Sequence, residues 1–147
     1  MKTYLLSTLS LGALLAACTT TPSAPGNAGN GQTAAVVVKD SITGTVTYRD
    51  RMALPPTAVG RVQLQDVSLQ DVAATIIDSV TIRPNGRQVP LSFTLHYDTA
   101  RIRPANTYVV QAYILDSGRI IYRTDAAYPV LTRGNPKQAA LVLRRSQ

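Results

Sequence analysis

The segment VPLSFTLHY, residues 89–97, decides the fold because its apolar and polar residues alternate without a break. A period of two is the pattern of a β-strand with one buried and one solvent-facing side. ITGTVTYR at 42–49 and RVQLQDV at 61–67 show the same alternation. The residues that we expect to face the core in the first segment are Val89, Leu91, Phe93, Leu95 and Tyr97.

The rest of the chain after residue 36 continues as short strands separated by turns. Ser117 and Gly118 lie between two β-rich runs and predict a tight hairpin, and Pro129 is expected on a sheet edge. No window of about 12 residues has the period of an amphipathic helix. The further strands are predicted at 74–82, 107–115, 119–124, 127–131 and 138–145. The sequence therefore predicts an all-β domain over 36–147, a single antiparallel β-sandwich of about seven to eight strands.

The N-terminus has the features of an export signal. Lys2 precedes a short apolar run over 5–15, which is shorter than the roughly 20 residues that a membrane-spanning helix needs. We therefore expect a signal peptide over 1–17. LAAC at 15–18 resembles the lipobox of bacterial lipoproteins, which implies that Cys18 is acylated and begins the mature chain. An ordinary signal peptide followed by a chance cysteine is the alternative.

Acylation of Cys18 would explain a lone cysteine, since the chain has no second thiol for a disulfide. Several acyl chains on one residue hold a protein durably on a membrane, with palmitate as a typical chain. Thr19 follows where similar lipoproteins that stay in the inner membrane carry Asp, which favours the outer membrane, facing the periplasm. Residues 18–35 carry no charge and predict a flexible linker.

The net charge of the chain indicates which kinds of partner it can bind. The chain has 15 basic and 8 acidic residues, a formal net charge of +7, and 12 of the basic residues are Arg. Arginine favours bidentate contacts with carboxylate or phosphate, so anionic lipid or an acidic partner is expected. The sequence has no basic run with interleaved aromatic residues, which is the pattern that would indicate nucleic-acid binding. Because the charges are dispersed along the chain, a merely solvated surface is the alternative.

Three motifs carry a family resemblance: YRDRMALPPTAVGRVQLQDVS at 48–68, YDTARIRP at 97–104 and DAAYPVLTRGNP at 125–136. They resemble the YbaY family of bacterial lipoproteins, which is related to the YscW lipoprotein chaperones of type III secretion. The resemblance implies a small, lipid-anchored antiparallel β-sandwich without enzymatic activity. Some of these proteins act as pilotins that escort a secretin to the outer membrane, which implies an envelope protein partner such as a secretin.

The first motif has a structural and a functional interpretation. Pro55 and Pro56 fix the backbone and remove N–H donors, as expected where a chain crosses from one sheet to another. The same turn could instead present a contact surface to a partner, and an exposed sheet edge could accept a partner's strand. The candidate partner-binding residues are Arg49, Asp50, Arg51, Met52, Leu54, Pro55, Pro56, Arg101 and Arg103.

Two rival hypotheses remain beside a protein-contact role. In the first, the domain is an envelope binding module for cell-wall glycan or anionic lipid, held by Arg-rich loops at 83–87, 101–103 and 133. In the second, the chain is a structural lipoprotein without a dedicated ligand. The sequence does not indicate an oligomeric state.

Groups that could catalyse a reaction are sparse. His96 is the only histidine and lies on the expected outward side of its strand. No Ser lies in a nucleophile-elbow motif, and neither zinc-ligand spacing nor a calcium loop is present. We therefore expect no enzymatic activity, no metal and no cofactor.

Overall fold

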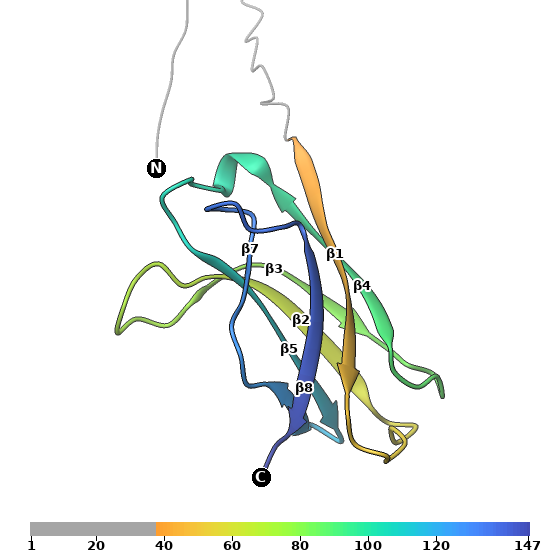
Figure 1. Ribbon diagram of the computed structural model, residues 1–147. Helices are drawn as coiled ribbons and strands as arrows, with labels where there is room; N and C mark the ends of the chain where they lie inside the picture. The colour runs from red at the N-terminus through yellow and green to blue at the C-terminus, as the bar shows by residue number, and fades with distance from the viewer. Residues whose placement is uncertain (1–37) are drawn as a thin grey trace, which may run out of the picture. The chain divides into compact units, whose positions relative to one another are not determined.

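The structure is a computed structural model that describes residues 38–147 (Figure 1). The expected signal peptide at 1–17, Cys18 and the linker over 18–35 lie outside the described residues. Eight strands occur at the predicted places, with a short 3-10 helix between the fourth and fifth. The elements are β1 (Lys39–Tyr48), β2 (Val59–Asp66), β3 (Thr75–Ile82), β4 (Leu91–Asp98), η1 (Thr99–Arg101), β5 (Tyr108–Asp116), β6 (Arg119–Thr124), β7 (Tyr128–Val130) and β8 (Gln138–Arg145).

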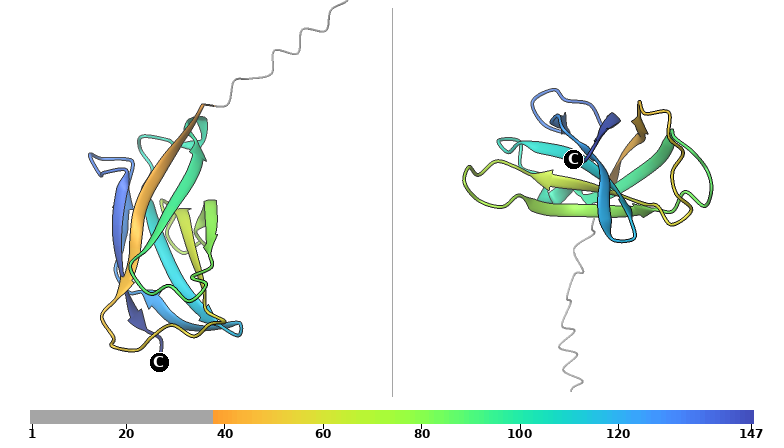
Figure 2. Two further views of the ribbon diagram at one scale, coloured as in Figure 1. Left: turned by 90° about the vertical axis from the view of Figure 1, so that its right-hand side faces the viewer. Right: turned by 90° about the horizontal axis from the view of Figure 1, so that it is seen from below.

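The strands form one sheet and not the two stacked sheets of a sandwich. Their order is β3-β2-β5-β6-β8-β1-β4, and β7 pairs with β5. The sheet curls so that its end strands, β3 and β4, lie next to one another, as the views of Figure 2 show. The all-β prediction is confirmed, but the sandwich differs in detail from this nearly closed, barrel-like sheet. Alternation fails to distinguish the two because both architectures bury one side of every strand.

One strand pair departs from the expected antiparallel arrangement. β1 pairs antiparallel with β4 but parallel with β8, with Gly44 opposite Phe93 on one side and opposite Ala139 on the other. Parallel pairing requires a long connection, and here the whole domain lies between the two strands. β1 and β8, the first and last strands of the domain, therefore stabilise each other.

Side chains bridge the two end strands. Within residues 38–147 no backbone ladder joins β3 to β4. Instead, the His96 backbone N–H on β4 donates a 2.8 Å hydrogen bond to the Asp78 carboxylate on β3. The Arg101 guanidinium of η1 donates to the Ile77 carbonyl of β3 at 3.3 Å. Both edges thereby use some of the backbone groups that would otherwise be open to another strand.

A tyrosine fills a second gap in the hydrogen bonding. β6 pairs with β8 only from Leu143 to Arg145, which leaves the preceding part of β8 without a strand on that side. The Tyr128 hydroxyl accepts a 2.9 Å hydrogen bond from the Val142 N–H and donates one of 3.3 Å to the Val142 carbonyl. β7 pairs with β5 alone, so Pro129 lies on an edge as predicted.

The core is the concave side of the curled sheet, where the alternating residues meet. All five of the residues predicted to face inward at 89–97 are buried or partly buried, and their neighbours in β4 are exposed. Ser117 and Gly118 both have positive φ, the requirement of the predicted tight hairpin turn. The fully buried large side chains are Tyr108, Ile42, Leu64, Leu95, Ile114, Leu141, Val46, Val62, Val110 and Val130.

A polar cluster fixes the beginning of β1. Asp40 accepts a 3.0 Å hydrogen bond from the Tyr97 hydroxyl and forms a 2.5 Å ion pair with Lys137. The Lys137 hydrogen bond is the largest cause that lowers the pKa of the Asp40 carboxyl. Burial and the bond to Asp40 raise the pKa of Tyr97 to about 12.

Replacement of Gly44 by Ala should destabilise the domain. A Cβ at this position would lie 2.0 Å from the Ala139 carbonyl oxygen and 2.6 Å from the Phe93 ring, so β8 or β4 must shift. We expect a loss of about 3 kcal/mol in the free energy of unfolding, measured by urea denaturation. The control is Gly60→Ala in β2, where the nearest atom would be at an ordinary 3.5 Å. Equal denaturation midpoints for the two variants would contradict the expectation.

The second prediction concerns alkaline pH. A tyrosine in the unfolded chain titrates at about pH 10, so the raised pKa of Tyr97 favours the folded state below that pH. This contribution should disappear as the pH rises from about 10 to about 12. Tyr97→Phe should show a shallower decline in unfolding free energy over the same interval, because Phe has no proton to lose. Parallel declines for variant and wild type would refute the assignment.

Candidate functional site

The direction of the strands places four chain segments at one end of the sheet. They are the 49–58 loop between β1 and β2, the 83–90 loop between β3 and β4, the β5–β6 hairpin and the end of β8. We call this the distal end, because it is opposite Val38, where the described chain begins (Figure 1). β1 alone separates the two ends by about 30 Å.

Three contacts hold the 49–58 loop against its neighbours at the distal end. Gln88 of the 83–90 loop accepts a 2.8 Å hydrogen bond from the Leu54 N–H. Thr57 donates a 2.5 Å hydrogen bond to Asp116 at the end of β5. The Arg145 guanidinium of β8 approaches the Met52 sulfur at 3.2 Å. The distal end is therefore a continuous surface built from four segments that are distant in sequence.

The candidate residues of the 49–56 loop divide into buried and exposed groups. Leu54 is buried in the core, and Pro55 is partly covered, which agrees with the structural interpretation of the motif. Beneath them the Tyr48 ring stacks on Tyr122 with centroids 4.4 Å apart, and the Tyr48 hydroxyl donates to the Met52 carbonyl at 2.8 Å. The loop's exposed candidates are Arg49, Asp50, Arg51, Met52 and Pro56.

The stacked tyrosines stay neutral. Burial raises the pKa of the Tyr48 hydroxyl, and the negative charge of Asp50 adds to the effect. Burial is also the largest cause that raises the pKa of Tyr122, followed by a hydrogen bond with Asp50. Neither phenol is thus suited to act as a proton acceptor near neutral pH.

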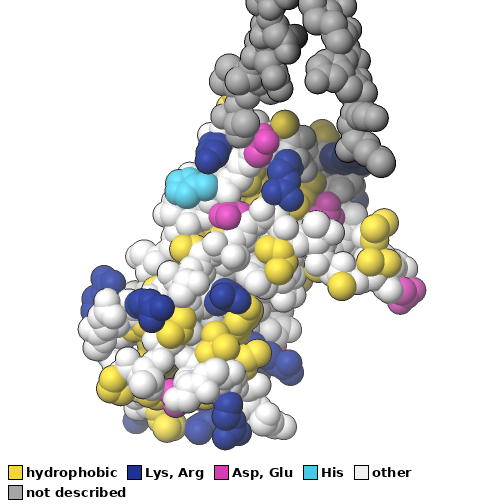
Figure 3. Space-filling view, turned by 180° about the vertical axis from the view of Figure 1, so that it is seen from behind, with side chains coloured by type: hydrophobic (Ala, Val, Ile, Leu, Met, Phe, Trp, Pro, Cys, Tyr) yellow, Lys and Arg dark blue, Asp and Glu magenta, His cyan; other side chains and the backbone are white. Residues whose placement is uncertain are grey.

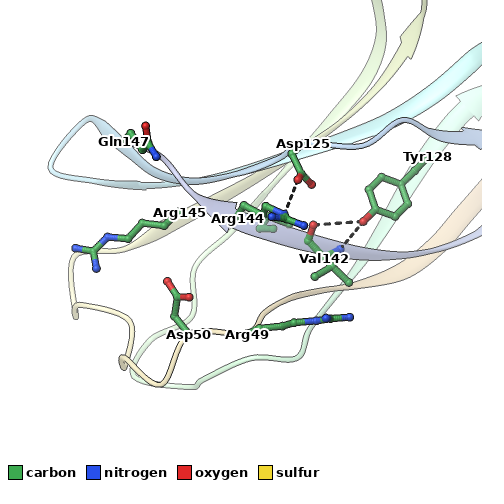
Figure 4. Close-up of a pocket in the computed structure, with 9 residues that line it drawn as sticks. Arg49, Asp50, Asp125, Tyr128, Val142, Arg144, Arg145 and Gln147 are labelled. Atoms are coloured by element: carbon green, nitrogen blue, oxygen red, sulfur yellow. Dashed lines mark hydrogen bonds and ion pairs between the residues drawn. The ribbon is translucent and has the colours of Figure 1, made fainter.

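An open cleft of about 690 Å³ lies beside the loop at the end of β8, lined by Arg49 and Asp50 after β1 and by Asp125 and Tyr128 after β6 (Figure 4). Arg144 points to Asp125 and forms a 2.5 Å ion pair with it, whereas Arg49 and Arg145 point in different directions away from that pair. The residues that line the cleft are Arg49, Asp50, Asp125, Tyr128, Val142, Leu143, Arg144, Arg145 and Gln147. With three arginines and two aspartates, this lining suits an anionic group.

Arg101 and Arg103 do not join this surface. Lys39 pairs with Asp98, so η1 and the following residues lie at the Val38 end. Arg101 contacts the β3 backbone, and the Arg103 N–H donates a 3.0 Å hydrogen bond to the Tyr108 hydroxyl. The structure therefore places these two candidates at the opposite end from Arg49 to Pro56. It likewise separates the loop at 83–87 from those at 101–103 and 133, so the rival ligand site is not assembled in one place.

Sequence analysis missed the contribution of β8 to the distal surface. The sequence places Arg144 and Arg145 in a strand, and two arginines at a strand's end are a signal of a change from core to solvent. Asp125 and Tyr128, which also line the cleft, belong in sequence only to a family motif. Their meeting with Arg49 depends on the parallel β1–β8 pair, for which the sequence carries no local signal.

The described residues contain no grouping typical of a metal site or a membrane-spanning helix. His96 is exposed on β4, and among residues 38–147 no three His, Cys, Asp or Glu side chains could together hold a metal ion. In the same range no helix is sufficiently long and apolar to cross a membrane.

Comparison with known proteins gives consistent relatives. Residues 37–143 match the family model described as type III secretion system lipoprotein chaperone (YscW). The uncharacterized lipoprotein YbaY of Escherichia coli (strain K12) is 33% identical over 101 residues, which cover 69% of this chain and 53% of that protein. The chain thus matches about half the length of this curated relative.

A solved structure extends the likeness to the fold. The structure of an alternative pilotin from the type II secretion system of Vibrio cholerae superposes with a TM-score of 0.72 and 42% sequence identity. The match covers 75% of this chain and 99% of the pilotin chain. With the family model spanning the described domain almost completely, these matches show that the chain belongs to the YscW family of type III secretion system lipoprotein chaperones.

Proposed function

We propose that the protein is an outer-membrane lipoprotein, anchored at Cys18, that acts as a chaperone or pilotin for an envelope component such as a secretin. Membership of the lipoprotein chaperone family and the likeness to a pilotin support a chaperone-like role. The observation that carries the proposal is the placement of the exposed loop residues at the distal end, opposite Val38.

This placement suits a lipid-anchored protein that acts by contact. The residues before Val38 would connect the domain to Cys18, and a coil of about 20 residues has a root-mean-square span of about 25 Å. The Val38 end would then face the anchoring leaflet, and the distal end would face the periplasm. Binding there requires neither a reaction nor a cofactor, in keeping with a non-enzymatic role.

The anchor can be tested by changing Cys18 and its neighbour. In a Gram-negative host, Cys18→Ser should abolish the added mass of the acyl chains, because no thiol remains to be acylated. Thr19→Asp should keep the lipid but redirect the protein to the inner membrane, whereas Thr19→Ser should change neither. Fractionation and intact-mass measurement give the result. A wild-type protein whose intact mass shows no acyl chains at Cys18 would exclude the anchor.

The chaperone role predicts a defect in secretin assembly. In a strain that lacks this protein, membrane fractionation should show about tenfold fewer secretin multimers in the outer membrane. The wild-type gene should restore them. Gln88→Ala should restore them only partly, because Leu54 loses its hydrogen-bond acceptor and the 49–58 loop loosens. The matched control is Gln138→Ala, which changes an exposed side chain at the start of β8, remote from that loop. Unchanged multimers in the deletion strain would refute the proposed role.

A further inference from the structure

The distal end carries an unusual concentration of arginine. Seven arginines lie on its loops and strand ends, and all of them are exposed. They are Arg49, Arg51, Arg83, Arg87, Arg119, Arg144 and Arg145, and we call them the distal arginine surface. Lys and Arg side chains gather toward this end in the view from behind (Figure 3).

Carboxylates at the same end are too few to balance these charges. Three aspartates lie there: Asp50, Asp116 and Asp125. Within the described range only Asp125 is within ion-pair distance of an arginine of this surface, Arg144 at 2.5 Å. Asp116 instead accepts hydrogen bonds from Thr57 and Ser117. The distal end therefore has an excess of four positive charges.

The Val38 end is different. There Lys39, Arg101, Arg103, Arg133 and Lys137 are accompanied by Asp40, Asp66 and Asp98. Three of these five cations also contact the fold, since Lys137 pairs with Asp40 and Arg101 contacts the Ile77 carbonyl. Arg133 similarly donates to the Ala105 carbonyl at 3.2 Å. The larger excess of positive charge therefore lies at the distal end, four charges against two among these residues.

Like charges gathered on one surface repel one another and lower the stability of the folded state. A surface that contacts only water gains no stability from clustered charges. Where an anion binds, its negative charge offsets the repulsion between the arginines. Guanidinium groups pair in a bidentate way with carboxylates, and Arg49 and Arg145 flank a cleft large enough to admit such side chains. Met52, 55% exposed and in contact with Arg145, adds an apolar contact beside them.

We propose that the distal arginine surface binds an acidic segment of a partner protein, with Asp or Glu carboxylates received by Arg49 and Arg145. This inference deepens the proposed function and rests on it, because it names the chemistry of the partner. Anionic lipid also presents negative charge, but the distal end lies opposite the end that would face the anchoring leaflet. A polypeptide in the periplasm therefore fits the surface better than a lipid headgroup.

Charge complementarity of this kind acts mainly on the rate of encounter. A patch of one sign attracts an oppositely charged segment over about a Debye length, roughly 8 Å at physiological ionic strength. Added salt should then weaken binding strongly. A chaperone that captures its client in transit would benefit from fast association more than from slow dissociation.

The proposal can be tested with synthetic peptides and the full chain in detergent. The probe is a short fluorescent peptide in which Asp alternates with Ser, and its matched control replaces Asp by Asn. Fluorescence anisotropy should show binding of the acidic peptide alone. The double variant Arg49→Gln with Arg145→Gln should weaken it by about tenfold, and raised salt should weaken it for wild type.

Matched variants distinguish the effect of the distal arginine surface on peptide binding from the effect of the chain's total charge. Lys39→Gln with Arg103→Gln removes two exposed charges at the Val38 end and should leave peptide binding unchanged. A second distal pair, Arg51→Gln with Arg119→Gln, should weaken binding again, which guards against a folding defect in the first pair. Urea midpoints of all three variants should stay close to wild type because the side chains are exposed.

Three results would overturn the inference. The acidic peptide does not bind, it binds the distal variants as tightly as wild type, or phosphatidylglycerol vesicles added as competitor bind the same arginines more tightly than the peptide does. If the peptide fails to bind while deletion of the gene still abolishes secretin multimers, the inference is wrong and the proposed function stands. If the peptide binds but the multimers are unaffected, the chaperone role is wrong instead.

Discussion

Burial of one side of a single curled sheet is the constraint on which the rest of the structure depends. Within residues 38–147 no α-helix covers the interior, so the sheet must cover itself, and its end strands must meet. Tyr108, Ile42 and Leu64 are among the side chains that this curl removes from water, each contributing about 2 kcal/mol. In the resulting order β1 lies between β8 and β4, and the curl brings β3, at the other end of the order, next to β4.

The same constraint sorts the loops into two groups with different chemistry. Strands that pass through a common core deliver their connections to one end or the other, so residues distant in sequence become neighbours. Arg145 reaches Met52, and Gln88 holds Leu54, because their strands end together. At the other end Asp40, Tyr97 and Lys137 form a compensated cluster. The charges of this cluster thus stabilise the domain at the Val38 end, whereas the arginines of the distal end stay available to a partner.

Local sequence predicted the strands well and their pairing poorly. Alternation located β1, β2 and β4, β-rich runs between turns located the other five strands, and Ser117-Gly118 located the hairpin, since all these signals depend on neighbouring residues. Two features depend instead on contacts across almost the whole domain. One is whether the buried sides belong to one sheet or two, and the other is the parallel pairing of β8 with β1. For the same reason the sequence grouped Arg101 and Arg103 with Arg49, whereas the fold separates them and supplies Arg144 and Arg145 instead.

The closed seam also bears on how a partner can bind. Strand addition needs an edge with free N–H and C=O groups, but the β4 edge gives an N–H to Asp78 and the β3 edge accepts from Arg101. A partner strand would have to break these bonds and separate β3 from β4 before it gained any of its own. The distal arginines are already exposed, so a carboxylate can reach them without rearrangement. Association through charge at the distal end therefore disrupts less structure than strand addition at the β3–β4 seam would.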